Sequence, residues 1–135
     1  MVPCFKARLE IGFTSNMDLG LSLRRRYQLA IRQRSIDIVN LDKKIAIECK
    51  RYTWTETGNV PSTKIGFTNE AAFYLSFLPD SYEKYIVMLR SHHEKRNESL
   101  AEYYSRSNMH LIGKTKVAEY DPECDELRII SADNE

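Results

Sequence analysis

The sequence predicts an α/β protein in which a central mixed β-sheet is flanked by helices. Apolar runs of strand length alternate along the chain with segments of helical periodicity. The stretch IDIVNLDKKIAIECKRY, residues 36–52, contains two such runs around a polar connector, which is typical of a β-hairpin. Strands separated by helices need crossover connections, and these produce a mixed sheet with helices packed against it.

The first third of the chain gives mixed signals. Residues 4–13 carry Phe or Leu at every fourth position, which predicts a helix. A further helical turn is predicted within 17–26. Residues 26–35 alternate as a strand does, although a helix fits them almost equally.

The middle of the chain gives clearer patterns. We expect hairpin strands at 35–41 and 44–52, with the turn at Asp42 and Lys43. A polar loop, 53–61, follows. The remaining predicted elements are a helix from 62 or 68 to 78, a strand at 85–89, a helix at 98–107, a strand starting within 109–113 and a hairpin of 117–120 and 126–130.

Length and composition indicate one globular domain spanning residues 1–135. No apolar run reaches the roughly 18 residues of a membrane span, and the first residues lack the apolar region of a signal peptide. We therefore expect an intracellular protein, cytoplasmic or associated with the nucleoid. Three scattered cysteines predict neither a disulfide framework nor a zinc site.

The net charge of +1 conceals an asymmetry between the two halves of the chain. Residues 1–60 carry a net charge of +5 and residues 61–135 carry −4. Basic residues are concentrated near the start, including Arg24, Arg25, Arg26, Arg32 and Arg34. Such a concentration is typical of a face that binds a polyanion, although a solvated, salt-bridged surface would give the same composition.

Three ionisable residues interrupt the apolar hairpin. Glu48 and Lys50 share one face of the second strand, because side chains alternate along a strand. If the two strands pair through their turn, Asp37 lies beside Glu48. Adjacent carboxylates repel each other unless a cation lies between them, and Mg²⁺ or Mn²⁺ with its preference for oxygen ligands suits such a pair. A half-solvated hairpin with alternating polar residues is the purely structural alternative.

These residues, in IDIV followed by IAIECK, resemble the core motif of the PD-(D/E)xK nuclease superfamily. The resemblance implies a three-layer, restriction-endonuclease-like sandwich. It also implies that Asp37 and Glu48 bind the metal and that Lys50 assists the attacking water. Ile36 stands where the motif often has Pro.

Family members often add a glutamate from the first helix to the metal site. Glu10 is the best-placed residue for this role and Asp18 is a weaker one, while the alternative for Glu10 is an ordinary surface position. Some members also use a basic residue from the helix after the motif, and Lys64 matches that position. Arg51 directly follows the motif and would contact the nucleic-acid backbone, together with the arginines at 24–34.

The resemblance implies a Mg²⁺-dependent endodeoxyribonuclease. The small size of the chain favours a structure-selective enzyme similar to junction resolvases, which would act on DNA as a homodimer. A restriction-type, viral or mobile-element nuclease is the nearest alternative. A nucleic-acid-binding protein that keeps this fold without catalysis is the alternative from another functional class.

Overall fold

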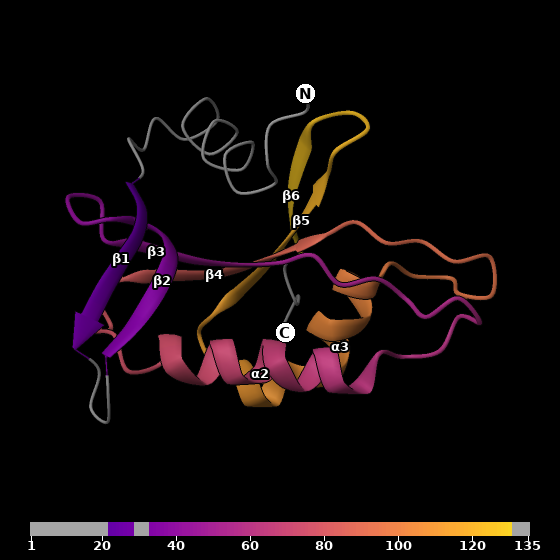
Figure 1. Ribbon diagram of the computed structural model, residues 1–135, viewed down its shortest axis with the longest axis horizontal. Coiled ribbons are helices and arrows are strands. Elements are labelled where there is room, and N and C mark those ends of the chain that lie inside the picture. Colours follow the sequence, from indigo (N-terminus) through magenta and orange to yellow (C-terminus); the bar gives the residue numbers. More distant parts are fainter. Residues whose placement is uncertain (1–21, 29–32, 131–135) are drawn as a thin grey trace.

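Within the residues that it describes, a computed structural model of the chain contains one β-sheet of six strands and two helices (Figure 1). It describes residues 22–28 and 33–130. The strands are β1 (Ser22–Gln28), β2 (Gln33–Asn40), β3 (Ile45–Lys50), β4 (Glu83–Leu89), β5 (Lys116–Asp121) and β6 (Glu126–Ile130). The helices are α2 (Ser62–Leu75) and α3 (Leu100–Ile112).

The six strands lie in the sheet in the order of the sequence. β1, β2 and β3 form an antiparallel meander. β3, β4 and β5 are parallel, with α2 and α3 in the two connections between them. β6 returns antiparallel to β5 as a terminal hairpin. The predicted α/β fold with a mixed sheet is therefore confirmed.

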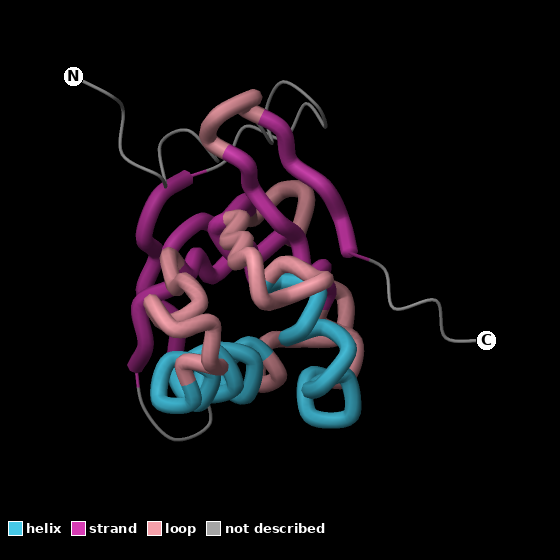
Figure 2. The backbone as a smooth tube through the Cα atoms, turned by 90° about the vertical axis from the view of Figure 1, so that its right-hand side faces the viewer, coloured by secondary structure: helices cyan, strands magenta, loops and turns pink. Residues whose placement is uncertain are grey.

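Both helices lie against the same face of the sheet (Figures 1 and 2). On this helix-covered face the sheet residues Ala46, Ile86 and Met88 pack with apolar residues of both helices. The opposite face carries a second apolar cluster, which includes Ile45, Ile47 and Cys49 of β3. β3 thus alternates between two clusters, as the sequence predicts for these residues.

The β2–β3 hairpin closes through a polar turn at 41–44. The backbone N–H of Lys43 donates to Oδ1 of Asn40 at 2.8 Å. Lys44 adopts a positive φ of 55°, which lets the chain reverse before β3 begins at Ile45. The turn is two residues longer than the predicted pair, because β2 ends one residue earlier and β3 begins one residue later than predicted.

The central strand predicted at 85–89 is confirmed, because β4 lies between β3 and β5 and is largely buried. The terminal hairpin is confirmed as well. The strand predicted to start within 109–113 is wrong, since those residues continue α3 to Ile112. The helical turn predicted within 17–26 is also wrong for residues 22–26, which lie in β1.

α3 begins at a capping box. The backbone N–H of Glu102 donates to the Ser99 hydroxyl at 3.2 Å, and the Glu102 carboxylate accepts from the Ser99 N–H at 3.0 Å. Hydrogen bonding from Ser99, mainly from its backbone N–H, holds the pKa of Glu102 below its usual value of 4.5. The helix ends at Gly113, which has a φ of 58°.

The helix predicted at 4–13 lies outside the described residues. Within the described ranges, no helix is long and apolar enough to cross a membrane.

Candidate metal and phosphate site

The antiparallel pairing of β2 with β3 brings Asp37 to the backbone of β3 next to Glu48. The paired residues are Asn40 with Ile45, Val39 with Ala46 and Ile38 with Ile47, and Asp37 directly precedes the last of these pairs. The backbone N–H of Cys49 donates to Oδ2 of Asp37 at 3.0 Å. This nitrogen belongs to the peptide bond between Glu48 and Cys49. The Asp37 carboxylate therefore lies against the backbone of β3 at Glu48.

The sheet is irregular at Asp37. The pairs between β1 and β2 include Leu23–Ile38 and Arg25–Ile36 but pass over the position between them. On its other side, the Asp37 carboxylate accepts from the Cys49 N–H of β3. Asp37 is half-buried. Local interruptions of a ladder re-aim side chains and are frequent next to functional sites.

Glu48 is buried, with 8% of its surface exposed. It follows Ala46 on the helix-covered face and pairs in register with Ile86 of β4. Burial of a carboxylate beside a second one raises the free energy of the charged pair unless positive charge compensates it. The position therefore favours a bound cation or a nearby basic group.

Lys50 is the last residue of β3 and lies two residues beyond Glu48 on the same face. Its ammonium nitrogen is 5.8 Å from the centroid of the Tyr52 ring. Within the described residues Lys50 forms no ion pair with a carboxylate. The Lys50 ammonium group therefore lies near the Tyr52 ring, and the residue is partly buried.

The two other basic candidates near this strand, Arg51 and Lys64, have different surroundings. Arg51 is exposed directly after β3. Lys64, in the first turn of α2, places its ammonium nitrogen 5.4 Å from the Tyr52 ring centroid. The same ring thus lies next to Lys50 and Lys64, although the two residues are 14 positions apart in the sequence.

The loop after β3 is held by the loop after β4. Nδ1 of His93 accepts from a backbone N–H, so its Nε2 carries the proton and donates to the Glu56 carbonyl at 2.9 Å. Nε of Arg96 donates to the Gly58 carbonyl at 2.7 Å. A Cβ at Gly58 would lie 2.7 Å from the His93 ring, and its φ of 82° also favours glycine. These contacts fix the segment that follows Lys50.

Trp54 has a structural role in this loop. It is 5% exposed and packs in the helix-side cluster, and the Arg96 guanidinium lies 4.4 Å from its ring centroid. Neither residue can therefore present its full surface to a ligand without opening the loop.

The donor set suits a hard divalent cation only in part. Asp37 and Glu48 supply carboxylate oxygens, which Mg²⁺ prefers, and Mg²⁺ commonly keeps several waters beside one or two carboxylates. Among the described residues there is no group of three or more His, Cys, Asp or Glu side chains placed to hold a metal. The pair fits a site that is completed by water and substrate oxygens.

Other predicted site residues lie in the first two strands or outside the described residues. Arg24, Arg25 and Arg26 lie in β1, which pairs with β2, and Arg34 lies in β2. Glu10 and Arg32, together with the weaker metal candidate Asp18, lie outside the described residues.

A second buried carboxylate lies on β5. Glu119 is 3% exposed and pairs in register with Met88, which itself pairs with Lys50. Its Oε1 accepts from Nη2 of Arg128 on β6 at 2.9 Å. This carboxylate therefore has an arginine partner from the neighbouring strand.

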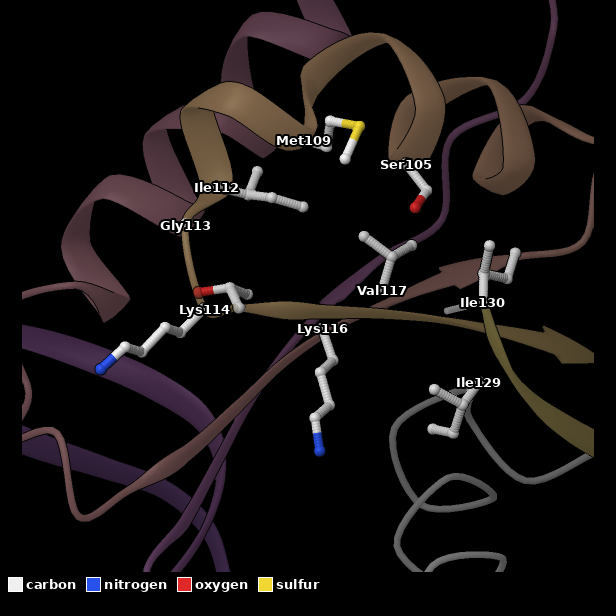
Figure 3. Close-up of a pocket in the computed structure, with 10 residues that line it drawn as sticks. Ser105, Met109, Ile112, Gly113, Lys114, Lys116, Val117, Ile129 and Ile130 are labelled. Atoms are coloured by element: carbon white, nitrogen blue, oxygen red, sulfur yellow. The ribbon is translucent and has the colours of Figure 1, made fainter. Parts of the chain in front are cut away.

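A cavity of about 370 Å³ lies between the end of α3 and the start of β5 (Figure 3). Met109, Ile112 and Val117 face this space, while Lys116 points away from its apolar part. Among the described residues, its lining contains no carboxylate. The cavity is therefore no candidate for the metal, and it lies two strands away from β3.

No protein-family model, curated protein or solved structure matches this chain. Its function must therefore be inferred from its own residues.

Proposed function

We propose that this protein is a metal-dependent nuclease that hydrolyses phosphodiester bonds in DNA. The observation that carries the proposal is the hydrogen bond from the Cys49 N–H to Asp37, which holds the Asp37 carboxylate against the backbone of β3 next to Glu48. Lys50 follows on the same face with no carboxylate partner among the described residues. The motif resemblance supports the same function.

Each residue has a distinct role in this proposal. Asp37 and Glu48 hold Mg²⁺ or Mn²⁺, and the bound ion supplies Lewis-acid polarisation of the phosphate and a more acidic water. Lys50 orients the attacking water and stabilises the negative charge that develops on the phosphate oxygens. The buried position of Glu48 strengthens these interactions because it lowers the local dielectric constant.

The substrate is proposed to lie at the carboxyl end of β3. In open α/β sheets, ligands commonly bind beyond the carboxyl ends of the strands. The loops after β3 and β4 meet there and hold each other through His93 and Arg96. Arginines of β1 and β2 would add phosphate contacts, so binding should weaken steeply with salt.

The finer features of the proposal come from the motif resemblance. They are a three-layer, restriction-endonuclease-like sandwich, structure-selective cleavage similar to that of junction resolvases, and a homodimer. A third layer requires a further element against the face of the sheet that α2 and α3 leave uncovered.

The test is a cleavage assay with branched, duplex and single-stranded DNA, with Mg²⁺, with Mn²⁺ and with EDTA. We expect metal-dependent cutting by the wild-type protein and its loss in Asp37→Asn and Lys50→Gln. DNA binding without cutting of any substrate would favour a binding protein instead. Absence of both binding and cutting would reject the proposal.

A further inference from the structure

A cationic and aromatic surface adjoins Lys50. It consists of Tyr52, Lys64 and Phe67, and we call it the Tyr52 surface. The Lys64 ammonium nitrogen lies 5.4 Å from the Tyr52 ring centroid and 5.7 Å from that of Phe67. Lys50 reaches the same Tyr52 ring at 5.8 Å. One surface therefore connects the proposed catalytic lysine with the start of α2.

The surface combines a fixed part with an exposed part. Tyr52 is partly buried and packs against the helix-side cluster, so its ring has a defined position. Phe67 is 45% exposed on α2, one helical turn after Lys64. An exposed aromatic ring next to an ammonium group is a suitable contact for a ligand that is both planar and anionic.

The start of α2 adds to the positive potential. Its first turn contains no acidic residue, and its N-cap residue, Pro61, makes no side-chain cap hydrogen bond. Lys64 lies in that turn. The partial positive charge of a helix N-terminus and a lysine there both favour a phosphate group.

A nucleotide has the chemistry that matches this combination. Stacking of a base on an aromatic side chain contributes substantially and tolerates any base, because every base has a π-face. In a duplex the faces of the bases are covered by their neighbours. An aromatic side chain can therefore stack on a base only where the strand is unpaired.

We infer that the Tyr52 surface binds one unpaired nucleotide of the substrate strand next to the bond that is cut. Phe67 and Tyr52 stack on the base, and Lys64 contacts its phosphate. The inference rests on the proposed nuclease function for the identity of the strand, and it makes single strands, flaps and other unpaired regions the preferred substrates. Trp54 is excluded from this role because it is buried beneath Arg96.

The test measures binding in EDTA, where no metal-dependent cutting occurs. The probe is a single-stranded oligonucleotide that contains 2-aminopurine, whose fluorescence is quenched by stacking. We expect Phe67→Ala and Lys64→Gln each to weaken binding about tenfold, and Phe67→Ala to remove part of the quenching. Phe73→Ala, an exposed phenylalanine on the same helix, and Lys43→Gln, in the β2–β3 turn, are the matched controls and should bind as wild type does.

A second measurement compares cutting of a flapped duplex with cutting of a blunt duplex in Mg²⁺. Loss of the flap preference in Phe67→Ala, with the preference kept in Phe73→Ala, supports the inference. Wild-type binding and an unchanged preference in both Phe67→Ala and Lys64→Gln would overturn it and leave the nuclease proposal intact. Binding that depends on Phe67 in a protein that cuts nothing would reject the nuclease function and keep the nucleotide surface. Unchanged thermal unfolding of Phe67→Ala would confirm that the variant is folded.

Discussion

Two hairpins of the same sheet bury carboxylates in different ways. In the β5–β6 hairpin, Glu119 is matched by Arg128 of the adjacent strand at 2.9 Å. In the β2–β3 hairpin, the Asp37 carboxylate accepts from the backbone N–H of Cys49, next to the buried Glu48. Arg128 supplies positive charge to Glu119 from within the sheet. In the proposed site a bound cation would supply it to Asp37 and Glu48, and this difference separates a structural ion pair from a candidate active site.

The largest expected effect is on cleavage. Asp37→Asn, Glu48→Gln and Lys50→Gln should each lower the rate at least about a hundredfold, because each removes a metal ligand or a charge-stabilising donor. Single-turnover cleavage in Mg²⁺ measures this. Lys116→Gln is the matched control, since Lys116 also lies over a tyrosine ring, that of Tyr85, but away from the site. An equal loss of cleavage rate in Lys116→Gln and Lys50→Gln would contradict the assignment of Lys50 to the active site.

The β5–β6 hairpin should respond in stability instead. Arg128→Met leaves the Glu119 carboxylate buried without its partner, which should cost about 2 kcal/mol of unfolding free energy. The cost is moderated because the Arg128 side chain is 56% exposed. Urea denaturation measures the loss, and cleavage per folded molecule should be unchanged. A stable variant with impaired cleavage would reverse the assignment of the two hairpins.

The smallest effect concerns the start of α3, where Glu102 lies 3.4 Å from Arg128. The pKa of Glu102 is lowered in the folded protein, so its contribution to stability is complete above its unfolded value and is lost as the pH falls below about 4.5. Ser99→Ala should cost about 1 kcal/mol at neutral pH. The substitution should also reduce the loss of unfolding free energy that protonation of Glu102 causes at acid pH. Denaturation curves at pH 7 and pH 4 check both effects, and an unchanged pH dependence would contradict the assignment to the capping box.

The sequence predicted the hairpin pairing, the buried central strand and the terminal hairpin, because alternation and apolar runs are local signals. It missed the end of α3, where Ser107 and Asn108 are poor helix formers. Asn108 is kept in the helix by its contact with Asn69 of α2, whose Nδ2 donates to Asn108 Oδ1 at 3.1 Å. Such a contact between distant residues leaves no local signal.

The residues of the candidate site also divide into those that local sequence signals predict and those that they do not. Alternation along the second hairpin strand predicted that Glu48 and Lys50 share one face, and the hairpin pairing predicted that Asp37 lies beside Glu48. The contact of Lys64 with the Tyr52 ring depends on how α2 packs, whereas the spacing of Lys64 and Phe67 brings these two side chains together within the helix. The loop contacts of His93 and Arg96 depend on two segments more than 30 residues apart.

The central claim is that Asp37 and Glu48 together hold a divalent cation. Mn²⁺ titration followed by electron paramagnetic resonance tests it on the wild-type protein, Asp37→Asn, Glu48→Gln and Arg128→Met. We predict that wild type and Arg128→Met bind Mn²⁺ equally and that each carboxylate substitution weakens binding about tenfold or more. Equal Mn²⁺ binding by all four proteins, or none by the wild type, would contradict the claim.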